Sequence, residues 1–436
     1  MGRITSQVQT VVRRGLLRRV GPVDLSQVDR VPDRLTWPLL RQGFDPSRRL
    51  GRLREDAPVQ KLTSFLGINV WLVTGDPEVR QVLAHTTAFS NDIRPLFGRS
   101  GDAESGDIGG LGFTDPPDHT RLRRLLTPEF TMRRLERLRP RITAIVEERL
   151  DALAAAGDEP DLVREFAFPV PFQVICELLG LPAEERDVFR SLASARFDVT
   201  YGGAGVVGAI SGSREHLRDF VARQRIDPGD GLVGQIIRER GDEVSDFDLA
   251  GLADGAFTGG LETSASMLAL GTAVLLGHPY HYRRLATDPS SVDPTVEELL
   301  RYLSVVQVAF PRFAKAPLEL GGRRIAAGDV VMCHLAGAAR DPRVGMDGHF
   351  DPQRPVRAGQ LAFGHGFHRC VGAELARMEL RIAFPALARR FPDLRPAVDD
   401  LAFRERSIVY GVESLPVVLN ISPSSPKEMT APQSHW

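Results

Sequence analysis

Residues Phe363–Gly372 read FGHGFHRCVG, and this stretch decides how the whole chain is interpreted. The chain has only three cysteines, yet Cys370 lies here among glycines, histidines and an arginine, directly before a predicted helix. Glycines let a backbone approach a bound group closely or adopt positive φ. A helix N-terminus stabilises a thiolate through its free N–H groups and its dipole. From these residues alone, three readings of Cys370 stay open: a nucleophile, a metal ligand or an inert turn residue.

The composition is that of a soluble globular protein, with 42% hydrophobic and 25% charged residues. Lys+Arg number 55 and Asp+Glu 56, so the net charge of -1 argues against a nucleic-acid binder that relies on overall positive charge. Cys176, Cys333 and Cys370 are far apart and form no CxxC. We therefore expect neither a disulfide framework nor a four-cysteine metal site, and a reducing cytoplasm fits best.

The two ends of the chain differ from its middle. Residues 1–34 are arginine-rich, and RRGLLRR has no apolar region after it, so an N-terminal arm is favoured over an export signal. Residues 421–436 are rich in Pro and Ser and are predicted to be disordered. Residues 35–420 are predicted to form one catalytic domain. No stretch reads as long and apolar enough to span a membrane.

Helical patterns dominate this domain. Residues 137–157 carry spaced aliphatic side chains and end at glycine. The longest predicted helix covers 245–277, where Ser245 with Asp248 makes a capping box and Gly-His-Pro makes a stop. A further helix follows Cys370 to about residue 391, with Pro385 expected to bend or end its first part.

Strand patterns are short and fall in two places. One is NVWLVTG at residues 69–75. The other lies between Leu318 and Leu335, where LELGGRRI and DVVMCHL are interpreted as a hairpin that turns at Gly321-Gly322. The domain is therefore predicted to be mainly α with a small β portion.

The complete ten-residue string resembles the haem-binding loop of cytochromes P450, whose pattern is Phe-Gly-x-Gly-x-His-x-Cys-x-Gly. The matching positions are Phe363, Gly364, Gly366, His368, Cys370 and Gly372. The resemblance implies the cytochrome P450 fold, with a long central helix over the haem and the cysteine loop beneath it. It also implies haem b as cofactor, the Cys370 thiolate as axial ligand, and His368 near a haem propionate. The spacing of His365, His368 and Cys370 matches no common zinc pattern.

A second motif supports this resemblance. In EELLRY, Glu298 and Arg301 lie one helical turn apart and can pair. Such a pair is commonplace on surfaces, but the family has an ExxR pair upstream of its cysteine that joins a third residue in a buried network. The matching third residue here is Arg354, in FDPQR.

The sequence GGLET, residues 259–263, lies in the middle of the longest predicted helix. Two mid-helix glycines cost about 1 kcal/mol each relative to alanine, so close helix packing or a nearby cofactor should compensate. The family places an Ala/Gly-Gly-x-acid-Thr signature over the haem, where the helix opens locally to form an oxygen pocket. By resemblance, Gly259 and Gly260 approach the cofactor, while Glu262 and Thr263 deliver protons. A buried Glu262 needs a partner or a water path.

Haem propionates need cationic donors. In DPPDHTRLRRLL, His119 and Arg123 lie at i,i+4 on one helical face, and FPRFA supplies Arg312. All three resemble the propionate-binding residues of the family. Arg121 and Arg124 are read either as a solvated face or as a contact for a redox partner.

The resemblance implies a monooxygenase that activates O₂ with two electrons and hydroxylates or epoxidises a lipophilic small molecule, in bacterial natural-product tailoring. No flavin domain follows the haem helix, so electrons are expected from a separate ferredoxin and ferredoxin reductase. One alternative is oxidative coupling on the same scaffold without oxygen insertion. Another is a non-enzymatic haem sensor, against which Glu262 and Thr263 argue.

By resemblance the substrate faces residues 91–113, 191–212, 256–260, 305–310 and 407–410. A glycine-rich run at 201–214 is expected to form a mobile lid. The apolar side chains predicted to line the pocket are Ala256, Phe257, Val306, Val308, Phe310, Ile408 and Val409.

Overall fold

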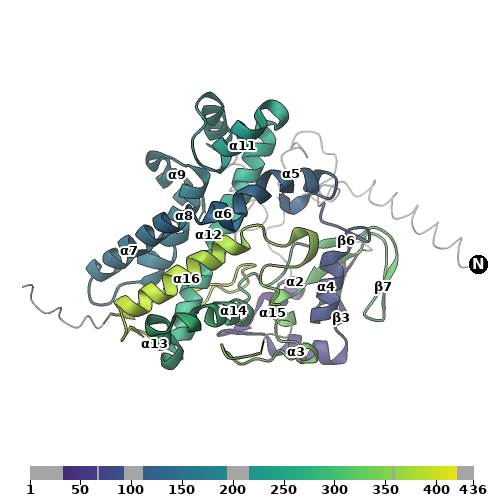
Figure 1. The fold of residues 1–436 in the computed structure, drawn as a ribbon. Helices are drawn as coiled ribbons and strands as arrows, with labels where there is room; N and C mark the ends of the chain where they lie inside the picture. The colour runs from purple at the N-terminus through teal and green to yellow at the C-terminus, as the bar shows by residue number, and fades with distance from the viewer. Residues whose placement is uncertain (1–32, 66–67, 93–110, 194–215, 356–358, 420–436) are drawn as a thin grey trace, which may run out of the picture.

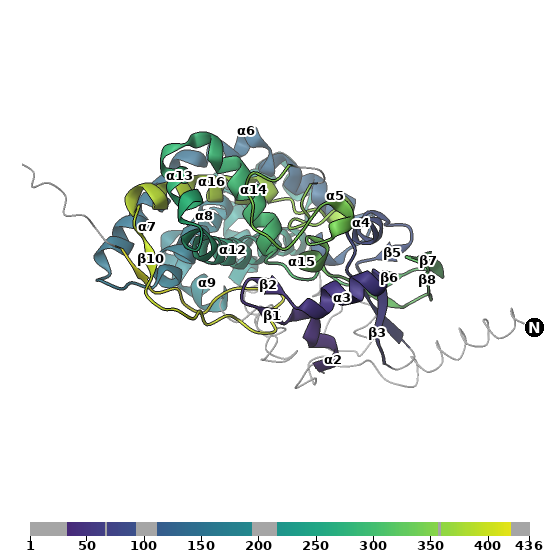
Figure 2. The same ribbon diagram turned by 90° about the horizontal axis from the view of Figure 1, so that it is seen from below.

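The computed structural model describes residues 33–65, 68–92, 111–193, 216–355 and 359–419. Helices make up most of this part of the chain, and a small sheet lies to one side of them, as predicted (Figures 1 and 2). The α-helices are α2 (Asp33–Thr36), α3 (Arg48–Asp56), α4 (Asp76–Ala84), α5 (Asp118–Leu126), α6 (Met132–Leu135), α7 (Arg139–Ala155), α8 (Pro169–Leu179), α9 (Arg186–Ala193), α11 (Leu232–Arg240), α12 (Asp246–Leu276), α13 (Pro279–Thr287), α14 (Val292–Leu303), α15 (Leu335–Ala338) and α16 (Ala373–Arg390).

The main sheet mixes strands from distant parts of the chain. Its order is β3 (Val59–Phe65), β4 (Ile68–Val73), β9 (Val330–Cys333), β6 (Arg312–Ala314) and β5 (Phe89–Ser90). β4 and β9 run parallel, and the other neighbours run antiparallel. Three antiparallel pairs lie outside it: β1 (Arg41–Gln42) with β2 (Asp45–Pro46), β7 (Leu318–Leu320) with β8 (Arg323–Ile325), and β10 (Arg395–Pro396) with β11 (Val417–Val418).

The predicted hairpin between Leu318 and Leu335 is only partly right. It is formed by β7 and β8 alone, which turn at Gly321 and Gly322, both at positive φ. β9 instead joins the main sheet between β4 and β6. In this position β9 buries alternate side chains, and Val331 and Cys333 pack into the apolar core next to the sheet.

Helix α12 is the central element, as the sequence predicts. The Ser245 hydroxyl accepts a hydrogen bond from the Asp248 N–H at 3.1 Å, which caps the first turn. At 1.5 Å per residue the 31 residues span about 46 Å. Contrary to the expectation from the sequence, α12 is long and apolar enough to cross a membrane by length and composition. However, 78% of its apolar window is buried inside the protein, as in a core helix.

The large apolar core surrounds α12 and joins it to α7, α8, α14 and α16. The helix predicted at 137–157 is confirmed as α7, which buries Ile142, Ile145 and Val146 at helical spacing. The helix after Cys370 is α16. Pro385 does not end it, since the helix continues to Arg390 with the proline buried in the core.

Several predictions fall outside the described residues. The arm predicted at residues 1–34 lies outside except for 33 and 34, which begin α2. The tail at 421–436 and the predicted lid at 201–214 lie outside as well. Of the predicted substrate segments, 93–110 and 194–212 also lie outside the described residues.

Candidate functional site

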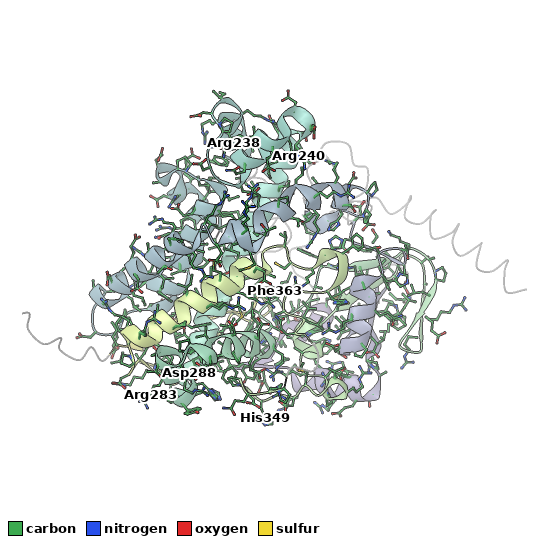
Figure 3. The ribbon with its side chains drawn as sticks, viewed as in Figure 1. Arg238, Arg240, Arg283, Asp288, His349 and Phe363 are labelled. Atoms are coloured by element: carbon green, nitrogen blue, oxygen red, sulfur yellow. The ribbon has the colours of Figure 1, made fainter. Side chains whose placement is uncertain are left out.

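The loop before α16 is a closed turn that needs its glycines. The Cys370 N–H donates to the Phe363 carbonyl at 2.9 Å, which closes the loop. Gly364 and Gly366 have φ of 69° and 71°, the left-handed region that favours glycine. A Cβ on Gly366 would also lie 2.6 Å from the Leu83 carbonyl oxygen at the end of α4. Figure 3 labels Phe363 next to the start of α16, near the middle of the molecule.

Cys370 differs from the other two cysteines. Cys176 and Cys333 are buried in apolar cores, and burial raises the pKa of each thiol to about 12. Cys370, in contrast, is exposed to solvent, although many protein atoms surround it. Burial raises its pKa, while the Gly372 N–H and nearby arginines, Arg123 first, act to lower it. Of the three, Cys370 alone is placed to bind a ligand.

Helix α12 has an open face at its midpoint. Gly255 and Gly259 are exposed within an otherwise buried helix, and a Cβ on either would meet nothing within 4 Å. Gly260 instead allows close helix packing, because a Cβ at this position would lie 3.0 Å from Ile175 Cδ1 of α8. The Thr263 hydroxyl donates to the Gly259 carbonyl at 2.7 Å. The helix is α-helical throughout, so the expected local opening is absent here.

Glu262, one turn beyond Gly259, is buried and has a partner that the sequence did not reveal. Its carboxylate forms an ion pair with the Arg404 guanidinium. Arg404 comes from the loop-rich C-terminal region, where no spacing connects it to α12. The buried carboxylate is therefore compensated, as its burial requires.

Histidine and arginine side chains gather near the cysteine loop from three elements. The His119 ring, on α5, lies 4.1 Å from the His368 ring, centroid to centroid. Burial and the charge of Arg123 lower the pKa of His119. Burial, followed by His119 and Arg312, lowers the pKa of His368 to about 3. Burial also lowers the pKa of Arg312, at the start of β6. Burial and the neighbouring positive charges favour the neutral form of both histidines, and two arginines with two imidazoles are suited to bind anionic groups.

This arrangement fits the haem that the resemblance implies. Both ring nitrogens of His119 are buried without a hydrogen-bond partner, which is costly unless a bound group provides one. The four predicted propionate ligands, His119, Arg123, Arg312 and His368, influence one another electrostatically and so lie close together. A thiol open to solvent, a glycine face without side chains and orphaned donors are the features that a flat, dicarboxylate cofactor requires.

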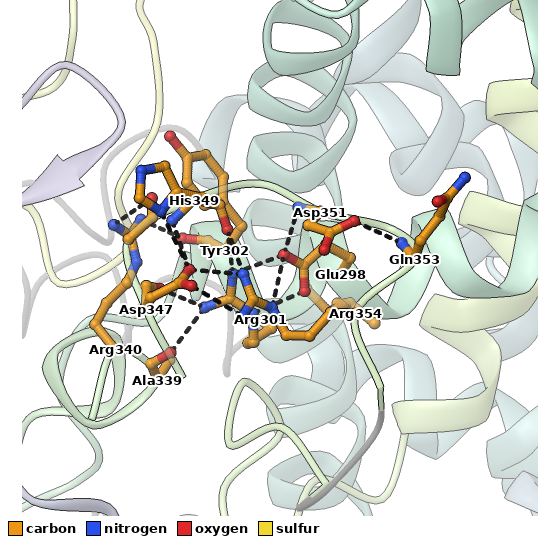
Figure 4. Close-up of polar contacts among 12 residues, drawn as sticks. Glu298, Arg301, Tyr302, Ala339, Arg340, Asp347, His349, Asp351, Gln353 and Arg354 are labelled. Carbon is orange, nitrogen blue, oxygen red and sulfur yellow. Dashed lines mark hydrogen bonds and ion pairs between the residues drawn. The ribbon is translucent and has the colours of Figure 1, made fainter. Parts of the chain in front are cut away.

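The predicted ExxR network is present and is drawn in Figure 4. Arg301 donates to both carboxylate oxygens of Glu298 at 2.7 Å, and the pair is almost fully buried. Arg301 also donates to the carbonyls of Ala339, Asp347 and His349. Arg354 lies 3.6 Å from Glu298 and pairs with Asp347 at 2.6 Å. The network holds α14 to the segment that leads into the cysteine loop.

A second network escaped the sequence prediction. Arg377 of α16 pairs with Glu297 of α14, with Nε 2.5 Å from the carboxylate. Its guanidinium stacks over the Phe363 ring at 4.7 Å from the centroid. Gln360 bridges Glu297 to the Ala362 N–H. Arg377 lies in the second turn of α16, which begins at Ala373 just after the cysteine loop. This position in the sequence was the available signal.

A buried carboxyl, Glu379 of α16, was also missed. Its nearest polar partner is Ser264 of α12, the residue after Thr263, and its Oε2 has no hydrogen-bond partner in the described structure. Burial raises its pKa to about 8. Burial therefore favours the neutral form of Glu379.

Two of the predicted pocket residues are exposed apolar side chains. Phe310 is 51% and Ile408 is 42% exposed. Phe310 packs edge-on against Phe113, whose η4 segment (Leu111–Phe113) contacts α12. The Gln307 N–H donates to the Ile408 carbonyl at 3.0 Å, which joins the two segments. Ala256 and Val306 are partly exposed as well.

Three other predicted pocket residues are core residues. Phe257 is buried against Phe172 and Phe189, because its position on α12 faces α8 and α9 rather than the open face. Val308 and Val409 are also buried, and each takes part in a β-bridge, Val308 with His334 and Val409 with Val306. Their backbone supports the segments that carry Phe310 and Ile408.

Comparisons with known proteins show the family to which the chain belongs. The family model described as Cytochrome P450 matches residues 290–411. Cytochrome P450 monooxygenase PikC of Streptomyces venezuelae is 39% identical over 380 residues, which cover 86% of this chain and 91% of PikC.

Two solved structures extend the likeness to the fold. OxyE, a cytochrome P450 involved in teicoplanin biosynthesis, has a TM-score of 0.79 at 39% identity and covers 87% of this chain and 99% of its own. OxyC, a cytochrome P450 implicated in an oxidative C–C coupling reaction during vancomycin biosynthesis, has a TM-score of 0.79 at 36% identity. It covers 87% of this chain and 95% of its own.

Proposed function

Because the chain belongs to the cytochrome P450 family, we propose that it is a cytoplasmic haem-thiolate monooxygenase that hydroxylates or epoxidises a lipophilic small molecule in bacterial natural-product tailoring. The family is one of haem-iron oxidoreductases with a cysteine thiolate as axial ligand. The observation that carries the proposal is the accessible Cys370 thiol beside the orphaned nitrogens of His119. Residues 35–420 form the catalytic domain in this proposal.

The bound haem supplies reductive activation of O₂, and its thiolate ligand donates electron density that favours O–O cleavage. Cys370 would hold the haem iron through its thiolate, and its closed loop and the Gly372 N–H position the sulfur for this. His119, Arg123, Arg312 and His368 bind the propionates. Charge-assisted hydrogen bonds from these donors to the carboxylates would fix the cofactor's orientation and give the buried His119 nitrogens a partner.

Thr263 and Glu262 handle the protons. The Thr263 hydroxyl lies beside the open glycine face, where its oxygen can accept and pass on a proton while its bond to Gly259 holds it in place. Glu262 is the adjacent acid and reaches away from this face towards Arg404. A hydroxyl at the open face and a carboxylate behind it form an ordered route for protons.

The substrate binds against an apolar wall. Phe113, Phe310 and Ile408 present apolar surface from which a lipophilic ligand would displace water, and such walls typically bind lipophilic ligands. Electrons come from a separate ferredoxin and its reductase. The exposed Arg124 and Arg369 provide positive charge for docking an acidic partner. Arg121 is instead engaged by Asp248 at 2.8 Å.

A second candidate function is oxidative coupling without oxygen insertion. The likeness to OxyC, implicated in an oxidative C–C coupling reaction, favours it. The two functions use the same haem and the same proton route, so they differ in the fate of the substrate rather than in the site.

Two measurements test the proposal. The reduced protein with carbon monoxide should show the long-wavelength Soret band of a thiolate-ligated haem, and a short-wavelength band in freshly prepared protein would contradict it. Lipophilic natural products are then screened by the spin-state shift of the ferric Soret band. Each compound that shifts the band is turned over with surrogate ferredoxin under ¹⁸O₂. Gain of one labelled oxygen identifies monooxygenation, whereas loss of two hydrogens without label identifies coupling.

A further inference from the structure

The open face of α12 ends where another segment covers the helix. Residues 402–413 form a hairpin, in which the Arg404 N–H donates to the Gly411 carbonyl at 2.9 Å and the Glu413 N–H to the Ala402 carbonyl at 2.8 Å. Gly259 is exposed, whereas Glu262, three residues later on the same side of α12, is buried by its contact with Arg404. This hairpin therefore meets α12 at the predicted proton-delivery acid.

The hairpin is shaped to admit the Arg404 side chain. A Cβ on Gly411 would lie 2.8 Å from Ser266 Oγ and 3.6 Å from Arg404 Cζ. Ser266 lies one turn after Glu262 on α12, and its hydroxyl is buried without a partner in the described structure. The missing side chain at Gly411 thus lets the guanidinium and two polar groups of α12 share one space.

The ion pair also connects the core to solvent. The Glu262 side chain is 8% exposed and the Arg404 side chain 27% exposed. Arg404 Nε lies 3.8 Å from the Glu413 carboxylate, which is at the surface. The exposed fraction of the side chains thus rises from Glu262 through Arg404 to Glu413.

We propose that Arg404 is the positioning residue of the proton route: by pairing with the Glu262 carboxylate it keeps that group turned to the 402–413 hairpin, from which protons reach it. The inference rests on the proposed function, because it assumes that Glu262 delivers protons to the haem site. The ion pair compensates the burial of the Glu262 carboxylate and fixes the direction in which it points. Glu262 then takes its proton at the solvent end and gives it up towards Thr263.

A test needs no organic substrate. Driven by NADPH through surrogate ferredoxin and its reductase, the haem site reduces O₂ with two electrons and two protons to peroxide, or with four of each to water. Water requires proton delivery for O–O cleavage, so the share of O₂ released as peroxide reports on the route. The variants are Arg404→Gln, Arg404→Lys, Glu262→Gln and the double variant Arg404→Gln/Glu262→Gln. Arg406→Gln is the matched control, since it removes an arginine–carboxylate pair with Asp33 from the same hairpin.

We expect Arg404→Gln to raise the ratio of peroxide to water about tenfold, a part of the ~10²–10⁴-fold that positioned proton transfer contributes to rates. Arg404→Lys should restore most of the water formation, because it returns the positive charge. In the Glu262→Gln background, Arg404→Gln should not raise the ratio of peroxide to water any further, because it acts through Glu262. Arg406→Gln should match the wild type.

Urea unfolding supplies a readout independent of turnover. Arg404→Gln should lower the folding equilibrium constant about tenfold more in the wild-type background than in the Glu262→Gln background. Additive effects of the two substitutions, in unfolding or in peroxide share, would overturn the inference. So would a wild-type peroxide share in Arg404→Gln. Loss of the thiolate-type carbon monoxide band in the wild-type protein would instead overturn the proposed function.

Discussion

The buried Glu298–Arg301 pair allows a prediction with a built-in control. Glu298→Gln keeps the shape of the side chain and an oxygen that can accept the Asp351 N–H, but it removes the negative charge. Arg301 is 3% exposed, so its guanidinium would remain buried with carbonyl partners only. Breaking a buried pair in this way typically costs about 3–5 kcal/mol, which is roughly two to four orders of magnitude in the folding equilibrium constant.

The control has the same geometry at the surface. Arg139 and Glu136 also lie at i,i+3, with two hydrogen bonds of 2.6 and 2.7 Å, but both side chains are more than 40% exposed. Glu136→Gln should leave the stability unchanged within error, since water replaces the lost contact. The two variants therefore differ in burial and hardly at all in hydrogen-bond geometry.

The assay is urea unfolding of the ferric holoprotein, followed by far-ultraviolet circular dichroism and by Soret absorbance. We expect a large fall in the midpoint for Glu298→Gln and none for Glu136→Gln. An apolar double variant, Glu298→Leu/Arg301→Met, should not recover the loss, because the carbonyls of Ala339, Asp347 and His349 would lose their donor. Equal midpoints for Glu298→Gln and Glu136→Gln would refute the argument from burial.

Three further predictions concern the site. Cys370→Ser should abolish the thiolate-type carbon monoxide band while Cys176→Ala retains it, and a normal band in Cys370→Ser would exclude the axial role. Thr263→Ala should raise the peroxide share in NADPH-driven turnover, because the hydroxyl beside Gly259 is lost; an unchanged share would remove Thr263 from the proton route. Glu379→Gln should stabilise the protein most at alkaline pH. The folded pKa of Glu379 is raised to about 8, so the native state binds more protons than the unfolded state, and stability falls as pH rises from about 4.5 to 8. Unfolding at several pH values checks this, since a wild-type pH slope in the variant would contradict it.

Short motifs with a local physical cause were predictable. The cysteine loop needs left-handed backbone at positions 364 and 366, and the glycines at these positions indicate this requirement in the sequence. The ExxR pair follows from helical spacing, and its burial followed only from the family resemblance. The cap of α12 at Ser245 is likewise a local effect.

Features that depend on tertiary contacts were not predictable from one sequence. β9 reads as the partner of a nearby strand, yet its register with β4 is decided by packing across the chain. Phe257 is apolar and lies near the glycine pair, but one helical position turns it towards α8. Pro385 costs one hydrogen bond in α16, and burial of the surrounding helix outweighs that cost.

Two buried glutamates near the middle of α12 show how environment separates similar groups. Glu262 faces an arginine from the 402–413 hairpin, whereas Glu379 faces only the hydroxyl of Ser264. An opposite charge favours the ionised form, and burial without one favours the neutral form. The burial of Glu262 is thus compensated by an ion pair, whereas burial raises the pKa of Glu379 and favours its neutral form. Neither state follows from the residue type, because both depend on a partner that is distant in the sequence.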